Sequence, residues 1–135
     1  MTLVDTNVLL DLATDDPKWA EWSIQQLDAA ATRGPLIVNE ISYAELSVRF
    51  ARIEDVDRFL AIGGFTMAAT PRAALFLAGK AFQSYRARGG TRTGVLPDFL
   101  IGAHAAVKEL PLLTRDLGRY RSYFPTVSLI APGAR

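Results

Sequence analysis

Short apolar runs alternate along the chain with longer stretches of helical spacing, and this alternation limits the possible folds more than any other feature. The apolar runs predict buried strands at residues 3–4, 36–38, 65–68, 112–114 and 127–130. Between them, apolar side chains one turn apart predict helices over 8–12, 17–34, 41–51, 54–62, 71–89, 97–107 and 117–123. This order favours an α/β protein with a parallel sheet and helices on both faces. Ligands bind such sheets at the carboxyl ends of the strands, near the point where strand order reverses.

The chain has the size and composition of one globular domain. Its 135 residues are 50% hydrophobic and 21% charged, well outside the disordered range, and we expect a single domain over residues 1–135. The sequence has no cysteine, which excludes Cys-ligated metal sites and a thiol nucleophile. Its one histidine, His104, excludes any site that needs two imidazoles.

The hydropathy pattern favours a soluble, cytoplasmic protein with no membrane attachment. The first five residues lack a basic region and contain an acid, so they do not resemble a signal peptide. The longest uncharged stretches, 59–71 and 122–134, have 13 residues each and are broken by Gly or Pro. A membrane span needs about 20 apolar residues.

Charge is divided unevenly between the two halves of the chain. Residues 1–67 carry a net charge of −6 and residues 68–135 a net charge of +7, and 12 of the 15 basic residues are arginine. Arginine is suited to bidentate contacts with phosphate. The basic half therefore predicts either a surface for nucleic acid, a phosphorylated ligand or an acidic partner, or simply a solvated helical face.

Four carboxylates lie near the carboxyl ends of predicted strands or in the helices that follow them: Asp5, Glu45, Asp98 and Asp116. Each also has a structural interpretation. Asp5 and Asp116 can cap a helix or a turn, Asp98 complements the dipole of a helix that starts at Pro97, and Glu45 fits a capping box with Ser42.

The joint occurrence of these acids favours a metal site. If the sheet forms as predicted, Asp5, Asp98 and Asp116 point into one crevice, where carboxylates a few ångströms apart repel one another unless a cation lies between them. With no Cys and one His, oxygen ligands remain, and these suit Mg²⁺ or Mn²⁺. Such an ion activates water and offsets charge on a phosphoryl group.

Four segments also resemble the signature blocks of PIN-domain ribonucleases, in particular the VapC-like toxins of type II toxin–antitoxin (VapBC) systems. They are LVDTNVLLDL (3–12), NEISYAEL (39–46), LPDFLIGAHA (96–105) and LTRDLGRY (113–120). The resemblance runs in order from residue 3 to about residue 130. It implies a PIN-like three-layer α/β/α sandwich with a short, mostly parallel central sheet.

The resemblance also implies an activity and partners. In that family the matching acids, here Asp5, Glu45, Asp98 and Asp116, hold Mg²⁺ or Mn²⁺ in an endoribonuclease. A metal-activated water cleaves structured RNA such as tRNA or rRNA, leaving a 5′-phosphate and a 3′-hydroxyl. A homodimer and a cognate VapB-like antitoxin that fills the active-site groove, in a toxin–antitoxin hetero-oligomer, are implied as well.

Further residues receive supporting roles by the same resemblance. Asn7 and Thr114, with Thr6 as a further candidate, are expected to orient the carboxylates or water. Arg115, Arg119 and Arg92 are expected to contact RNA phosphates, which positions RNA without reading its sequence.

Several other polar and aromatic residues are left outside the expected site. His104 lies six residues after Asp98, about 120° away around the helix. Glu40 is expected to support the site or to serve as a cap. The remaining acids of the first quarter are expected to be helix-terminus and surface charges, and the aromatic residues to lie in the core or in an interface: Asp11, Asp15, Asp16, Trp19, Trp22, Phe76 and Phe82.

Two other functions compete with a metal-dependent nuclease. The segment around Asp5 also resembles the nucleophile loop of haloacid-dehalogenase-like phosphatases, but that chemistry needs an acid where this chain has Asn7. A module that binds RNA or protein through its basic surface without cleavage is the other alternative.

Overall fold

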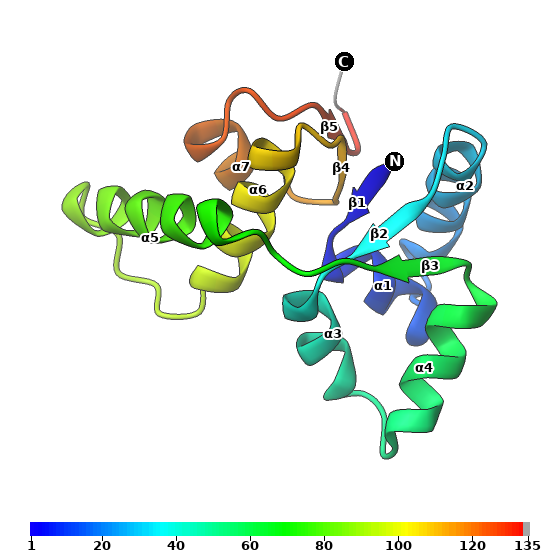
Figure 1. Cartoon of the computed structure of the whole chain (residues 1–135). Coiled ribbons are helices and arrows are strands. Elements are labelled where there is room, and N and C mark those ends of the chain that lie inside the picture. Colours follow the sequence, from blue (N-terminus) through cyan, green and yellow to red (C-terminus); the bar gives the residue numbers. More distant parts are fainter. Residues whose placement is uncertain (134–135) are drawn as a thin grey trace.

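Five short parallel strands form the central sheet (Figure 1). In the computed structural model, which describes residues 1–133, the strand order is β3-β2-β1-β4-β5, and each described pairing is parallel. The strands are β1 (Thr2–Val4), β2 (Leu36–Val38), β3 (Phe65–Met67), β4 (Leu112–Leu113) and β5 (Leu129–Ile130). All five coincide with predicted apolar runs, which confirms the expected parallel α/β sheet.

Seven helices connect and cover the strands in the described part of the chain. They are α1 (Thr6–Ala13), α2 (Ala20–Ala31), α3 (Glu40–Ser47), α4 (Ile53–Ile62), α5 (Arg72–Ala87), α6 (Leu96–Lys108) and α7 (Gly118–Tyr123). Helix α2 begins three residues after Pro17, because Asp16 first caps a turn by accepting from the amides of Lys18 and Trp19. Helix α3 ends at Ser47, before the predicted end at residue 51.

The start of α3 differs from the capping box expected at Ser42 and Glu45. Asn39, directly after β2, is the N-cap residue, and its Oδ1 accepts hydrogen bonds from the amides of Ile41 and Ser42. Asn is among the preferred N-cap residues because its side chain satisfies amides that have no partner within the helix. Glu45 is therefore not needed as a cap, and its carboxylate is available elsewhere.

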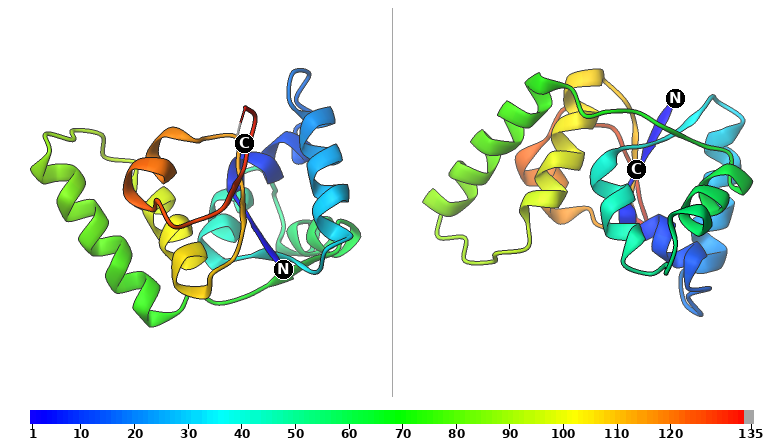
Figure 2. Two further views of the ribbon diagram at one scale, coloured as in Figure 1. Left: turned by 90° about the horizontal axis from the view of Figure 1, so that it is seen from above. Right: turned by 60° about the horizontal axis from the view of Figure 1, so that its bottom comes forward.

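Alternate side chains of the strands face two separate cores, as the period of a β-strand requires. Leu3, Ile37 and Leu112 pack with residues of α5, α6 and α7. Val4 and Leu113 point the other way and pack with residues of α1, α2, α3 and α4. Figures 1 and 2 show these two groups of helices on opposite sides of the sheet, which confirms the three-layer sandwich.

The order of the strands places a topological switch between β1 and β4. From β1 the chain adds β2 and then β3 on one side, and only later β4 and β5 on the other side. Asp5 follows β1 directly and Thr114 follows β4 directly, so both lie at the carboxyl edge on either side of the switch. This is the position at which open parallel sheets bind ligands. Across residues 1–133, no helix has the length and apolar character needed to cross a bilayer.

Candidate active site

Asp5 lies at the centre of a hydrogen-bond network at the switch point. Its side chain is 3% exposed and accepts hydrogen bonds from the Thr6 amide (2.7 Å), the Thr114 hydroxyl (2.7 Å) and the Tyr120 hydroxyl (2.8 Å). It also caps α1, as expected. Burial raises the pKa of Asp5 to about 6 against the lowering effect of the hydroxyl donors, and the charge of Asp98 raises it further.

Asn7 and Thr114 connect Asp5 to the segment that carries Asp116. The Thr114 hydroxyl donates to Asp5 and accepts from the amide of Asp116 at 3.0 Å. The Asn7 amide nitrogen lies 3.4 Å from both Asp5 Oδ2 and Thr114 Oγ1, and its oxygen accepts from the Arg115 amide at 3.2 Å. Both side chains therefore lie where they can orient carboxylates, the role expected for them.

Thr6 joins Glu45 to this network from the other side. The Thr6 hydroxyl hydrogen-bonds Glu45 Oε1 at 2.7 Å and Ser42 Oγ at 2.9 Å. The start of α1 thus contributes twice to the site: its N-cap Asp5 is one of the carboxylates, and Thr6 hydrogen-bonds the carboxylate of Glu45. Ser42, which the sequence suggested only as a helix cap, is buried and supports the Thr6 hydroxyl.

Asp98 and Asp116 share one arginine. Arg119 of α7 donates to the carboxylate of Asp98 on α6, and its Nη1 lies 4.0 Å from Asp116 Oδ2. The three side chains line an open cavity of about 340 Å³ together with Arg92. Burial raises the pKa of Asp98, and the charges of Glu45 and Asp116 add to that effect while Arg119 opposes it. Repulsion from Glu45 and Asp116 therefore disfavours the charged form of Asp98.

The four acids are of the type that binds a divalent cation, although their side chains do not converge on a common ion position. Among residues 1–133, no three Asp, Glu or His side chains are gathered closely enough to hold a metal, so the expected convergence of Asp5, Asp98 and Asp116 on one ion is not seen in these side-chain positions. Arg119 supplies positive charge between Asp98 and Asp116 instead. The donors are all carboxylates that repel one another, and such a set suits a hard cation.

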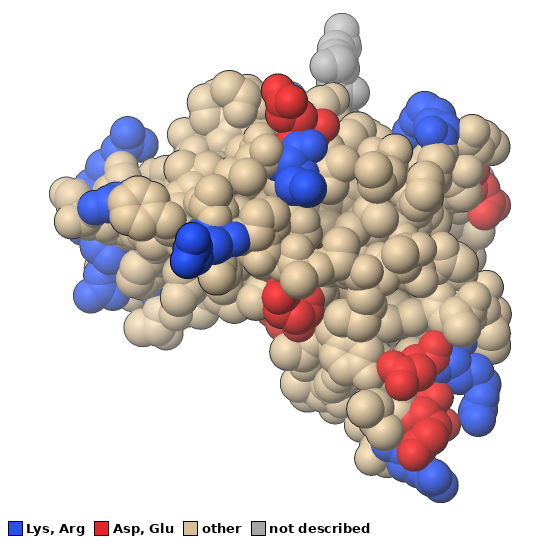
Figure 3. Space-filling model, in the orientation of Figure 1, with Lys and Arg blue, Asp and Glu red and all other residues tan. Residues whose placement is uncertain are grey.

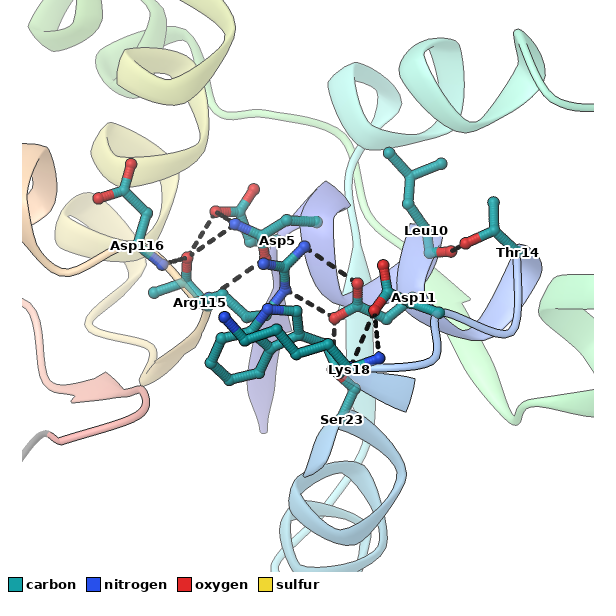
Figure 4. A network of polar contacts seen from close by, with 12 residues as sticks. Asp5, Leu10, Asp11, Thr14, Lys18, Ser23, Arg115 and Asp116 are labelled. Atoms are coloured by element: carbon teal, nitrogen blue, oxygen red, sulfur yellow. Dashed lines mark hydrogen bonds and ion pairs between the residues drawn. The ribbon is translucent and has the colours of Figure 1, made fainter. Parts of the chain in front are cut away.

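Arg115 forms an ion pair with the buried carboxylate of Asp11 that the sequence did not indicate (Figure 4). Arg115 Nε and Nη2 donate to the Asp11 carboxylate at 2.7 Å and 3.0 Å, and Ser23 donates to it at 2.7 Å. The Asp11 side chain is 2% exposed, so the interpretation of Asp11 as a surface charge is wrong. Arg115 was also expected to contact RNA phosphate. In the structure its guanidinium is instead paired with the Asp11 carboxylate.

The remaining candidates lie outside the acidic site. His104 is 1% exposed, and its Nδ1 lies 3.1 Å from Asn39 Nδ2. Its hydrogen bond is therefore with a buried amide and not with one of the four acids. Glu40 accepts from the Thr70 amide at 2.9 Å and from the Thr70 hydroxyl, which ties α3 to the segment after β3. Asp16 is a cap, as expected.

The aromatic candidates make other contacts. Trp19 and Trp22 meet edge to face with their ring centroids 5.9 Å apart, and Phe82 packs on Phe99 in the core. Phe76 is 69% exposed, so it is not a core residue.

Sequence reasoning missed Tyr120, a direct partner of Asp5. Tyr120 is 1% exposed, and its ring belongs to the core on the α5–α7 side of the sheet. A signal did exist, because Tyr120 is one of two tyrosines in a short helix with two arginines, four residues after Asp116. That signal predicts burial but not the contact with Asp5, which depends on how α7 packs on α6.

Comparison with known proteins identifies the family. Residues 2–123 match the PIN domain family over most of the chain. The chain belongs to the PIN domain family. No curated protein sequence gives a significant match.

Solved structures share the fold over nearly the whole chain. VapBC2 from Rickettsia felis, bound to a DNA fragment from its promoter, contains a chain with 18% sequence identity and a TM-score of 0.74, and the match covers 96% of this PIN-domain chain and 97% of that chain. A toxin–antitoxin complex from Klebsiella pneumoniae gives 22% identity and a TM-score of 0.69 over 100% of both chains. VapBC-1 from Haemophilus influenzae gives 16% identity and a TM-score of 0.71 over 96% of each. At these identities the likeness establishes the fold.

Proposed function

We propose that this PIN-domain protein is a divalent-metal-dependent endoribonuclease and the toxin of a VapBC-like pair. The observation that carries the proposal is the set of four acids at the carboxyl edge, Asp5, Glu45, Asp98 and Asp116, on both sides of the topological switch. Asp5 accepts hydrogen bonds from the Thr6 amide and from the Thr114 and Tyr120 hydroxyls, and Glu45 accepts one from Thr6. The Asp116 amide donates to Thr114, and Arg119 donates to Asp98. Family membership supports the same conclusion.

The chain's own groups supply the negative field that a cation and an attacking water require. Asp5, Asp98 and Asp116 would hold Mg²⁺ or Mn²⁺, with Glu45 beside them, and the bound ion would supply activation of water and charge compensation at the phosphate. Asn7 and Thr114 donate hydrogen bonds to Oδ2 of Asp5 and so hold its carboxylate in one orientation. Groups that orient metal ligands in this way commonly affect affinity strongly.

Arginines border the same cavity and favour a polyanionic substrate. Arg92 is exposed and lines the cavity with Arg119. Figure 3 shows further basic side chains at the end of the molecule formed by α5. RNA would approach over this basic surface, with Arg92 contacting phosphate, and Arg119 would contact phosphate once it leaves Asp98.

The structural neighbours support a protein partner. Those from Rickettsia felis and Klebsiella pneumoniae come from VapBC or toxin–antitoxin complexes. We extend this to the present chain and propose a VapB-like antitoxin that covers the acidic site, a homodimer of the toxin, and a cytoplasmic location for the complex.

Cleavage of RNA by the purified protein tests the proposal. We expect cleavage with Mn²⁺ or Mg²⁺, products with a 5′-phosphate, and no cleavage in EDTA. Asp5→Asn and Asp98→Asn should abolish cleavage while circular dichroism shows a folded protein. Asp55→Asn, at an exposed acid of α4, is the matched control and should cleave normally.

Two results would overturn the proposal. Undiminished cleavage in EDTA contradicts the metal dependence. Binding of an RNA pool without cleavage, across tRNA and rRNA substrates and with both metals, favours the module that binds without cutting. The phosphatase alternative finds no support, because Asn7 donates to Asp5 where that chemistry needs a second acid.

A further inference from the structure

The ion pair of Asp11 and Arg115 has no part in the chemistry proposed above, although it joins a buried carboxylate to several donors. Asp11 is a charged residue in the middle of α1 with a side chain that is 2% exposed. A buried carboxylate is costly unless it is paired and hydrogen-bonded. Arg115 meets it with two parallel hydrogen bonds, and Ser23 of α2 supplies a third donor. The Trp19 ring lies under the guanidinium at 5.0 Å.

Arg115 is also the residue between Thr114, which holds Asp5, and Asp116. Its backbone amide donates to Asn7 Oδ1, while its side chain reaches Asp11, four residues further along α1. Residues four apart lie on one face of a helix, so α1 offers two attachment points in a row to a single arginine. The segment after β4 is therefore fixed to α1 through both its backbone and its side chain.

Thr114, at the start of this segment, is held by the bond from its hydroxyl to Asp5 and by the bond from its amide to the Ile130 carbonyl, and Arg119 lies near the Asp116 carboxylate. Strand β4 has only two residues, and α7 begins at Gly118. Between them, the amide of Asp116 donates to Thr114 Oγ1, and the amide of Gly118 donates to Asp116 Oδ1. The first bond connects Asp116 to Asp5 through Thr114, and the second is local to the turn. The Arg115 side chain adds a separate attachment of the segment to α1 through Asp11.

We propose that Asp11 and Arg115 are positioning residues that set where the segment 114–118, and with it Asp116, lies relative to Asp5. The catalytic part of this inference rests on the proposed function, because Asp116 is a proposed metal ligand. The geometric part stands on the contacts alone. In this role Arg115 is a structural anchor for the site and does not contact RNA phosphate.

Three variants and a matched control test the proposal. Asp11→Asn and Arg115→Gln each break the pair, and the double variant Asp11→Asn with Arg115→Gln removes both charges and keeps a neutral, folded interior. Ser23→Ala is the control, because it removes a hydrogen bond from the same buried carboxylate without touching the segment 114–118. All four are compared by thermal unfolding, by amide hydrogen exchange of residues 115–118, and by calorimetric titration with Mn²⁺.

We expect faster exchange of the amides of 115–118 and Mn²⁺ binding weakened about 10-fold in the three variants of the pair, the order found for partners that orient metal ligands. Ser23→Ala should lower the melting temperature but leave both readouts at the parent level. Arg115→Lys should restore only part of the Mn²⁺ affinity, because an ammonium group does not reproduce the bidentate fork.

Unchanged exchange in Arg115→Gln and in the double variant would overturn the proposal, as would equal changes in Ser23→Ala. If the parent protein neither binds Mn²⁺ nor cleaves RNA, the proposed function fails, and the exchange measurement still decides whether the pair positions the segment. If the parent binds Mn²⁺ and the variants of the pair bind it equally well, the positioning role fails while the proposed function stands.

Discussion

The hydroxyl of Tyr120 donates a hydrogen bond to Oδ2 of Asp5 at 2.8 Å across a separation of 115 residues. Asp5 follows the first strand, and Tyr120 lies on the last helix, with its ring packed in the core and its hydroxyl at the acidic site. The contact joins the two ends of the chain at the carboxyl edge of the sheet. One side chain thus contributes both to packing and to the orientation of a carboxylate.

Tyr120→Phe keeps the ring and removes the hydroxyl. We expect the free energy of unfolding to fall by about 1–3 kcal/mol, because a buried carboxylate loses a donor. Denaturant titration at pH 7.5 measures this change. Tyr123→Phe is the control in the same helix and should be near neutral; an equal loss in both variants would contradict the assignment.

We expect Arg119 to oppose binding of a cation between Asp98 and Asp116. Arg119→Gln removes the guanidinium from the position where these two carboxylates need positive charge. We therefore expect Mn²⁺ to bind several-fold more tightly to this variant, as calorimetry would show. Arg58→Gln, at an exposed pair with Asp55, should leave Mn²⁺ affinity at the parent level. Weaker binding to Arg119→Gln would show that the arginine supports the cation.

Gly102 of α6 lies against the aromatic rings of Tyr120 on α7 and of Phe124 directly after it. A Cβ atom there would lie 2.5 Å from a ring carbon of Phe124 and 3.0 Å from one of Tyr120. Gly102→Ala should therefore destabilise the protein and disturb the Tyr120 contact with Asp5. Gly79→Ala is the matched control, because Gly79 also lies within a helix but its Cβ position is open. It should stabilise by about 0.5–1 kcal/mol through helix propensity, as a comparison of melting temperatures would show.

His104 should make stability fall in mild acid. Asn39 Oδ1 accepts from two backbone amides, so its Nδ2 faces His104 Nδ1, which must then accept and leave the ring neutral. Burial lowers the pKa of His104 below its ordinary value of 6.5, against the raising effect of Glu40. Just below pH 6.5 the unfolded chain therefore binds more protons than the folded protein. The contribution of neutral His104 to the free energy of unfolding is complete above pH 6.5 and is lost as the pH falls toward the folded-state pKa.

The measurement compares the parent protein with His104→Gln at pH 7.5 and 5.5. The difference in unfolding free energy between the two proteins should shrink at pH 5.5, by at most about 1.4 kcal/mol per pH unit. The comparison cancels the opposite contribution of Asp5. With a folded-state pKa near 6 against an ordinary 3.8, Asp5 adds stability as pH falls. A constant difference would contradict a buried neutral His104.

The sequence by itself determined the elements of this protein and the candidate acids. Apolar runs and helical spacing show which face of each element is buried, and they depend only on residues close in sequence. All five strands and the layer arrangement were therefore predictable. The acids after the strands could be selected because the parallel sheet brings the carboxyl ends of its strands to one edge. The helix start at Asn39 was missed because a capping box and a single Asn cap compete within the same few residues.

Only the tertiary structure decided which polar groups meet. Asp11 and Arg115 are 104 residues apart, and nothing local in either segment distinguishes a buried, paired Asp11 from a surface charge. The same is true of Tyr120 with Asp5 and of Arg119 with Asp98. Local patterns fix burial and helix ends, because those depend on neighbours within a turn or two. Pairing between charges depends on the order of the strands and the packing of α7 on α6, which exist only once the chain has folded.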